Sequence, residues 1–397
     1  MASYDAPGIA ARLMAQFAAR TGLAPAAAEQ ERYLWTDAFA VCNFLELLER
    51  TGDEEYHRCA TELIDRVHRV LGRFRADDVR TGWISGFDEE RGRRHPTAGG
   101  LRIGKPRKER NPDEPLDERL EWDRDGQYFH YLTKWLHALC QAAFVTGDNT
   151  YTRWAVELAE AAFNGFVRTS RSGEVVGVYW KMSTDLSRPL VPATGLHDAL
   201  DGFITFVEAR VAFASTSPHS AVLDTAIEAL SALCRGGSWT TQDPLGLGGL
   251  LFDACRLCRL MRGRSGDVRL LQNILDSCRH GFGLLLASRY FKQPAAHRLA
   301  FRELGLAIGL RGLGIIAGTV ANKSDESGAQ SALARSVEPL LRHERLYDEI
   351  VSFWLSHARH PDAQWQEHRN INEVMLATAL IPNRFLSIGD AAHGAAE

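Results

Sequence analysis

Two aspartates stand three residues apart in a largely apolar stretch, Asp198 and Asp201. On a helix this spacing places both carboxyl groups on one face. Cleavage of a sugar acetal requires paired carboxyl groups, because one donates a proton to the leaving oxygen while the other activates water or attacks directly. We therefore predict that Asp198 or Asp201 is one catalytic carboxyl group and that Asp125 is the other. The sequence leaves open which group is the acid and which is the base.

Asp125 is a third candidate carboxylate, preceded by Asp123 and followed by the run Tyr128-Phe129-His130. Both aspartates flank a predicted helix start, where the helix dipole favours the ionised form of a carboxyl group. We interpret Asp123 as the cap of that helix and Asp125 as a catalytic residue.

Glu303 is the fourth catalytic candidate, and it stands beside Arg302 in an apolar segment. A buried glutamate must be paired, because an isolated ion in the protein interior is costly. Two interpretations stay open. Glu303 and Arg302 form a structural salt bridge, or Arg302 binds a carboxylate or hydroxyl group of the substrate.

Tryptophans gather in the segments that join the predicted helices. Six of the nine lie in long connections or near the helix starts that follow them: Trp35, Trp83, Trp122, Trp180, Trp239 and Trp365. Aromatic rings stack on the apolar faces of sugars, so a cleft lined in this way suits a carbohydrate. For any single tryptophan, anchoring of a loop explains its position equally well. Together with polar residues of the same segments, the predicted substrate-binding residues are Trp35, Asp37, Trp122, Tyr128, His130, Trp180, His197, Arg302 and His368.

The chain that positions these residues has a helical pattern almost throughout. Apolar residues recur with a period of about 3.6 in segments 5–21, 31–51, 54–73, 125–146, 149–168, 197–216, 219–235, 245–262, 267–290, 297–320, 328–358 (with a break near Arg342) and 367–381. Strand character is confined to Glu174–Met182, which predicts one arm of a hairpin. The predicted class is all-α.

A small-Gly-Asp turn joins helices at three places: Thr51-Gly52-Asp53, Thr146-Gly147-Asp148 and Ser265-Gly266-Asp267. In each turn the glycine suits the left-handed residue that ends one helix, and the aspartate suits the cap of the next. The repeat predicts tight helical hairpins.

Short connections alternate with long ones, which span 74–124, 169–196, 236–244, 291–296 and 359–366. In an up-and-down helical array, alternate connections lie on opposite faces, so the long loops share one face. Helices that follow long loops begin at 31, 125, 197, 245, 297 and 367, and each has a partner. These six pairs predict an (α/α)6 toroid forming a single domain over residues 1–397.

One segment of the chain is unusually charged and another is unusually apolar. Residues 74–124 are rich in charges of both signs and predict either a rim or lid loop over the cleft or a solvated insertion. Residues Leu304 to Ala321 are apolar enough to resemble a membrane span, but Arg311 lies at the middle and glycines fall at small-xxx-small spacing. We predict a buried central helix there and no membrane partner.

The composition excludes several function classes. The net charge of −4 argues against a dedicated nucleic-acid binder. Seven scattered cysteines and the absence of a signal-like start at residue 1 predict a cytoplasmic protein. Cys255 and Cys258 lack a second pair at metal-ligand spacing, and no dinucleotide or phosphate-loop fingerprint appears, so we predict neither a metal nor a cofactor.

The hairpins with Thr-Gly-Asp turns, followed by a tyrosine and an Ala/Leu-rich helix, resemble the six-hairpin glycosidase-like superfamily, as do the Trp/Asp-rich helix starts. The resemblance implies an (α/α)6 fold. It also implies a sugar-processing activity, because that superfamily includes glycoside and unsaturated-uronyl hydrolases that use acidic residues. The similar fold of the N-acylglucosamine 2-epimerase family uses histidines.

Three functions stay open. The leading hypothesis is a glycoside hydrolase-like enzyme that acts on a small-molecule or oligosaccharide substrate through paired carboxylates. The second is a sugar epimerase or isomerase in which His197, His297 or His368 exchanges a proton next to a carbonyl group. The third is a non-catalytic toroid that binds a ligand or protein through its rim. The oligomeric state is not predicted.

Overall fold

The computed structural model describes residues 4–27, 31–212, 219–261, 268–321 and 328–389. Contacts divide the chain into two compact units. The first, here called the N-terminal unit, comprises Ala18–Leu233 with Gly389–Glu397, and the second, the C-terminal unit, comprises Met1–Phe17 with Cys234–Ile388. Each unit is described by itself. The extent of a single domain over 1–397 stays a prediction.

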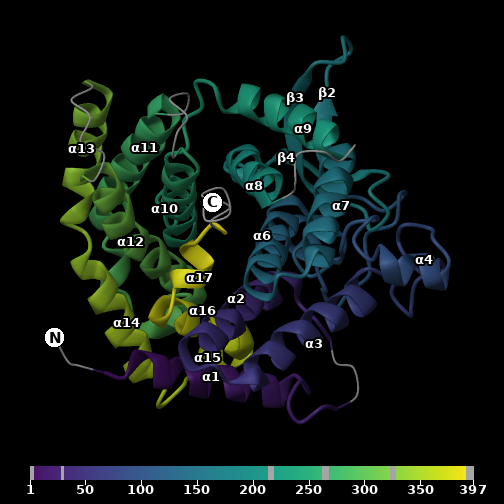
Figure 1. Cartoon of the computed structure of the whole chain (residues 1–397), viewed down its shortest axis with the longest axis horizontal. Coiled ribbons are helices and arrows are strands. Elements are labelled where there is room, and N and C mark those ends of the chain that lie inside the picture. Colours follow the sequence, from purple (N-terminus) through teal and green to yellow (C-terminus); the bar gives the residue numbers. More distant parts are fainter. Residues whose placement is uncertain (1–3, 28–30, 213–218, 262–267, 322–327, 390–397) are drawn as a thin grey trace, which may run out of the picture. The chain divides into compact units, whose positions relative to one another are not determined.

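The N-terminal unit is built on three helices that pack one after another: α2 (Leu34–Thr51), α6 (Phe129–Thr146) and α8 (Asp198–Ala212) (Figure 1). A second layer consists of α3 (Glu54–Leu71), which packs on α2, and α7 (Asn149–Phe166), which packs on α6. Helix α9 (His219–Cys234) follows α8 in the chain and is the last helix of this unit. The first three helices are buried around most of their circumference, whereas α3 is amphipathic, as its charged outer positions require.

The predicted hairpin turns form as expected. Gly52 and Gly147 end α2 and α6 with φ of 69° and 70°, in the left-handed region. Asp53 and Asp148 then accept hydrogen bonds from the backbone N–H groups of the next helices. The third predicted turn, 265–267, lies outside the described residues.

A small antiparallel sheet, more extensive than the predicted arm, packs beside these helices. Strand β3 (Val175–Met182) pairs with β1 (Gln127–Tyr128), β2 (Val167–Thr169) and β4 (Pro189–Thr194). The strand β1 explains why α6 begins at Phe129 and not at the predicted residue 125. Tyr128 pairs with Lys181 in the register of β1 and β3, which places the two aromatic segments side by side.

The charged segment 74–124 is not simply a solvated insertion. It contains α4 (Glu89–Arg94) and α5 (Glu118–Glu121), and its residues Thr97, Leu101 and Ile103 are fully buried. The Ile103 carbonyl accepts a hydrogen bond from Leu34 N–H, which ties the segment to the start of α2. Arginine–carboxylate pairing makes this polar segment compatible with partial burial.

The C-terminal unit repeats the layered plan. Helices α10 (Pro244–Leu260), α12 (Ala300–Ala321) and α16 (Arg369–Leu380) pack one after another, with α11 (Val268–Ala287), α13 (Gly328–Leu341) and α14 (Arg345–His357) as a second layer. The break predicted near Arg342 separates α13 from α14. The remaining elements are α1 (Ala6–Arg20), η2 (Tyr290–Lys292), η3 (Ala295–His297), α15 (Ala363–Glu367) and α17 (Asn383–Leu386).

Helix α12 is long and apolar enough to cross a membrane by length and composition, yet it packs against α10, α13, α14 and α16. Its glycines explain the close approach to α10. A Cβ atom on Gly248 would lie 2.2 Å from the carbonyl oxygen of Gly305, and one on Gly309 would lie 2.6 Å from that of Gly248. The prediction of a buried helix is confirmed for this face, whereas Gly318, near the end of α12, is exposed.

Candidate active site

Asp198 and Asp201 lie together on the first turn of α8, as their spacing predicts, and both are buried. Helix α6 supplies the partners of Asp201. Lys134 Nζ lies 2.6 Å from Asp201 Oδ1, and the Thr133 hydroxyl donates to Asp201 Oδ2. The lysine charge compensates the Asp201 carboxylate in a site that excludes most water. Asp201 is therefore firmly held by a cation and a hydroxyl group of α6.

Asp198 has a different environment. Burial, and secondarily the charge of Asp201, raise the pKa of Asp198 to about 8, although Lys134 acts in the opposite direction. Its Oδ2 atom has no hydrogen-bond partner among the described residues. A Cβ atom at Gly195 would lie 2.2 Å from that oxygen, so the carboxyl group is folded back against the turn before α8. A pKa of about 8 favours the protonated form of Asp198 at neutral pH.

His130 lies opposite Asp198 on α6. Its Nδ1 atom is 3.7 Å from Asp198 Oδ1, and the side chain is 31% exposed. Desolvation, together with the nearby Lys134 charge, lowers the pKa of His130 to about 4. Since Nδ1 is buried, Nε2 is the ring nitrogen on the accessible side. A neutral imidazole therefore stands beside a neutral carboxyl group.

Aromatic rings extend from His130 as a continuous wall. The ring centroids of Tyr128 and Tyr131 lie 5.3 Å and 4.8 Å from that of His130, and Trp180 on β3 lies 5.1 Å from Tyr128. Trp122 packs edge-on against Trp180 at 5.2 Å and is 52% exposed. We call Tyr128, Tyr131, Trp180 and Trp122 the aromatic wall. Tyr128 is buried, so the rings that a sugar can stack on are those of Tyr131, Trp180 and Trp122.

The wall continues to the start of α2. The hydroxyl groups of Tyr33 and Tyr131 lie 2.5 Å apart, and the Trp35 ring is 6.5 Å from that of Tyr131. Trp35 is largely buried, so it supports the wall from behind. His197 precedes α8, where its carbonyl accepts a hydrogen bond from Asp201 N–H.

Two predicted site residues of the same unit are held in ion pairs. Asp125 is fully buried; Arg102 donates to its Oδ2 atom and Gly104 N–H donates to Oδ1 at 2.9 Å. Asp37 accepts from Arg32 at 2.7 Å and 3.0 Å. Each carboxylate is thus engaged by an arginine inside the protein. The catalytic role of Asp125 and the substrate-binding role of Asp37 stay predictions.

The predicted residues of the C-terminal unit are not assigned to this site. Glu303 is fully buried, and its carboxylate pairs with Arg298 at 2.5 Å and accepts from Trp354 Nε1 at 2.9 Å. The expected structural salt bridge of Glu303 therefore exists, but its partner is Arg298. Arg302 instead pairs with Asp243 at 2.6 Å. His368 packs edge-on against Phe301, with ring centroids 5.9 Å apart.

Sequence reasoning missed Thr133, Lys134 and Tyr131. All three follow His130 within four residues, and Lys134 is one helical turn beyond it, a spacing that signals a shared face. Among the described residues, no group of three or more His, Cys, Asp or Glu side chains is placed to hold a metal ion.

Comparisons with known proteins find structural likeness alone. No family model matches the chain, and no curated protein matches it. The α-1,6-mannanase GH76A of Salegentibacter sp. HEL1_6 matches with a TM-score of 0.51 and 12% identity, over 96% of this chain and 100% of the mannanase. At this identity the likeness shows the fold alone, and the chain has the predicted (α/α)6 fold.

Two other structures are similar to this chain. An inactive variant of the same mannanase, in complex with α-1,6-mannotriose, matches with a TM-score of 0.50 and 12% identity over 96% of this chain and 100% of its own length. The cellobiose 2-epimerase of Spirochaeta thermophila matches with a TM-score of 0.42 and 11% identity over 81% of this chain and 87% of its own. Helices that begin at residues 34, 129, 198, 244, 300 and 369 correspond to the six predicted inner helices.

Proposed function

We propose that this protein is a carbohydrate-processing enzyme of the glycoside hydrolase type, and that Asp198 is its general acid. The observation that carries the proposal is a carboxyl group whose pKa is raised to about 8, placed at the end of an aromatic wall. A general acid must be protonated at the working pH and lie within reach of the leaving oxygen. The fold shared with a mannanase supports a sugar as substrate.

The two carboxyl groups then have distinct roles. Asp198 protonates the glycosidic oxygen, while Asp201, charged and fixed by Lys134 and Thr133, stabilises the positive charge that develops on the sugar ring. Loss of the Asp198 proton leaves a second carboxylate, which can take a proton from the incoming water. Asp198 and Asp201 are the same residue type on one helical turn. Their different roles therefore follow from their different surroundings.

The aromatic wall defines the substrate class. The half-buried rings of Tyr131 and Trp180 and the exposed ring of Trp122 present apolar faces, which suit the C–H surfaces of an uncharged sugar. The mannanase variant binds α-1,6-mannotriose, so α-linked manno-oligosaccharides head the list of substrates to test. A small-molecule or oligosaccharide substrate is accordingly the proposed partner.

Glycosidase screening with variants tests the proposal. Wild-type protein is assayed on aryl α- and β-glycosides and on α-1,6-linked manno-oligosaccharides, and any activity found is re-measured for Asp198→Asn, Asp201→Asn and the surface control Asp276→Asn. We expect both site variants to lose at least about 100-fold in kcat/KM, as removal of a general acid does, and the control to keep its activity. Full activity in a correctly folded Asp198→Asn variant rejects the assignment.

One observation favours a second candidate, a sugar epimerase or isomerase. His130 is neutral, and its accessible nitrogen can take a proton from a carbon next to a carbonyl group, with Asp198 as the neighbouring acid. The sequence predicts this role for His197, His297 or His368, and not for His130. Incubation of reducing sugars in deuterium oxide separates the two functions, because epimerisation incorporates solvent deuterium at carbon without cleaving a glycosidic bond.

We also propose a cytoplasmic location. All seven cysteines are free and buried, which supports a reducing compartment. Localisation of the tagged protein in its native cell tests this.

A further inference from the structure

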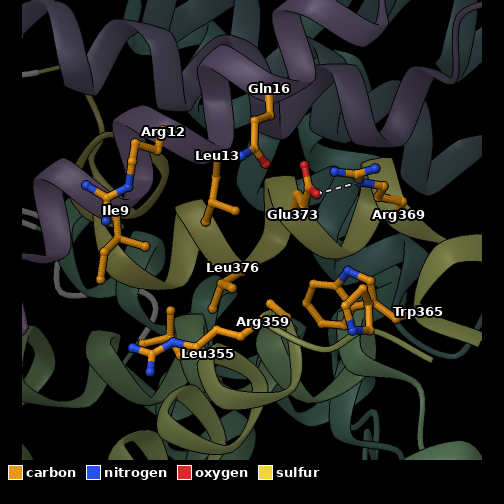
Figure 2. A pocket seen from close by; sticks show the side chains of 12 residues that line it. Ile9, Arg12, Leu13, Gln16, Leu355, Arg359, Trp365, Arg369, Glu373 and Leu376 are labelled. Carbon is orange, nitrogen blue, oxygen red and sulfur yellow. Dashed lines mark hydrogen bonds and ion pairs between the residues drawn. The ribbon is translucent and has the colours of Figure 1, made fainter.

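A pocket in the C-terminal unit is lined by residues of that unit alone. It has a volume of about 290 Å³ and is bounded by α1, the end of α14, the turn that follows it, α15 and α16. Figure 2 shows the side chains that line it. We call it the α1–α16 groove. Its apolar floor consists of Ile9, Leu13, Leu355 and Leu376.

Positive charge dominates the polar lining. Arg12, Arg359 and Arg369 all border the groove, against the single carboxylate of Glu373. Glu373 is already engaged, because it accepts from Arg369 Nε at 2.8 Å. In the part of the chain that the structure describes, no salt bridge involves Arg12 or Arg359, and both side chains are exposed. Two guanidinium groups therefore border an apolar floor without an acid to neutralise them.

Trp365 forms a rigid wall of the groove. Its indole stacks on Trp354, with ring centroids 5.8 Å apart, and Trp354 in turn donates to the buried Glu303. The backbone N–H of Trp365 donates to Asp362 Oδ1 at 2.8 Å, which fixes the start of α15. A preformed wall of this kind reduces the entropy lost when a ligand binds.

We propose that the α1–α16 groove binds a small organic anion that carries an apolar or planar body. Arg12 and Arg359 bind the anionic group, since guanidinium groups match carboxylate and phosphate oxygens in charge and geometry. The half-buried Ile9, Leu13 and Leu355 accept the body of the ligand, and the buried Trp365 and Leu376 support them. This site is independent of the proposed glycosidase site, and either proposal can fail without the other.

Direct binding measurements on the full chain test the proposal. The probes are 3-phenylpropionate and phenyl phosphate, with 3-phenylpropanamide as the uncharged control, and binding is followed by ligand-observed NMR and calorimetry. At about 10 mM probe, even a site with a millimolar Kd is mostly filled. We expect at least one anion to bind at least about tenfold more tightly than the amide, with an affinity that falls as salt is added. The preferred anion identifies the group as carboxylate or phosphate.

Variants locate the binding. Arg12→Gln and Arg359→Gln each weaken binding at least about fivefold and the double variant more, because each removes a charge-assisted contact. Arg335→Gln on α13 is the matched control and leaves binding unchanged. Three results overturn the proposal: neither anion binds, the amide binds as tightly as the anions, or the folded double variant binds like the wild type.

Discussion

The carboxyl group of Asp198 lies 3.7 Å from Nδ1 of His130, and burial raises the pKa of the first and lowers that of the second, so that it favours the neutral form of both. An aspartate and a histidine this close usually form an ion pair, in which the proton resides on the imidazole. Here desolvation disfavours both charged forms, and Lys134 adds to this by repelling a proton from His130. The proton therefore stays on Asp198, which suits a residue that must donate it to a substrate.

The first prediction concerns stability and pH. Because the pKa of Asp198 is raised in the folded state to about 8, its contribution to stability is present at low pH and is lost as pH rises toward 8. His130, with a lowered pKa, acts in the opposite direction but only below its ordinary value of 6.5. Between pH 6.5 and 8, of these two residues only Asp198 changes the unfolding free energy with pH. Denaturant unfolding in that window should show wild-type stability falling relative to Asp198→Asn, by at most about 1.4 kcal/mol per pH unit. Parallel curves for the two proteins contradict the raised pKa.

The second prediction concerns Lys134. Its replacement by methionine leaves the buried Asp201 carboxylate without its compensating charge, so we expect a loss of about 3 kcal/mol in unfolding free energy. Adding Asp201→Asn removes the stranded charge and should restore much of the lost stability. A double-mutant cycle by urea denaturation measures this coupling. Additive effects of the two substitutions argue against the ion pair.

The third prediction uses Gly195 as a positioning residue. A methyl group there would lie 2.2 Å from Asp198 Oδ2, so Gly195→Ala must displace the carboxyl group. We expect kcat on any substrate found by screening to fall at least about tenfold, since small misplacements of a catalytic group are costly. Gly283→Ala, at a helical position with open space around it, is the control and should have little effect. Equal activity of both variants shows that the position of Asp198 is unimportant.

The fourth prediction concerns the aromatic wall. Trp180→Ala removes a stacking surface, and we expect KM to rise up to about tenfold with a smaller change in kcat, consistent with about 1 kcal/mol for an aromatic contact. The exposed Leu116, in the same unit, provides a control substitution, Leu116→Ala. Should kcat fall while KM is unchanged, Trp180 does not act as a sugar platform.

The helical order was predictable because it depends on local signals. Glycine and aspartate at Gly52-Asp53 and Gly147-Asp148 form their turns as expected. Strands β1, β2 and β4 were not predicted, since they are short and gain their hydrogen bonds from β3, a long-range partner.

The candidate site was predictable only in part, and for a similar reason. The three-residue spacing of Asp198 and Asp201 is local, so their shared face follows from sequence. Asp125 is engaged by Arg102, which lies 23 residues away in the chain. Glu303 is engaged by Arg298 and Trp354. Whether a carboxylate is free or saturated is decided by such partners, which no local pattern reveals.

The protonation state of Asp198 is the centre of this account, and a carboxyl-carbon NMR titration measures it directly. Protein labelled with ¹³C at aspartate is titrated from pH 3 to pH 9, and the Asp198→Asn variant assigns the resonance. We predict that one aspartate resonance, absent from the variant, titrates near pH 8. If every aspartate resonance titrates near the ordinary value of about 4, Asp198 is ionised at neutral pH and cannot be the general acid.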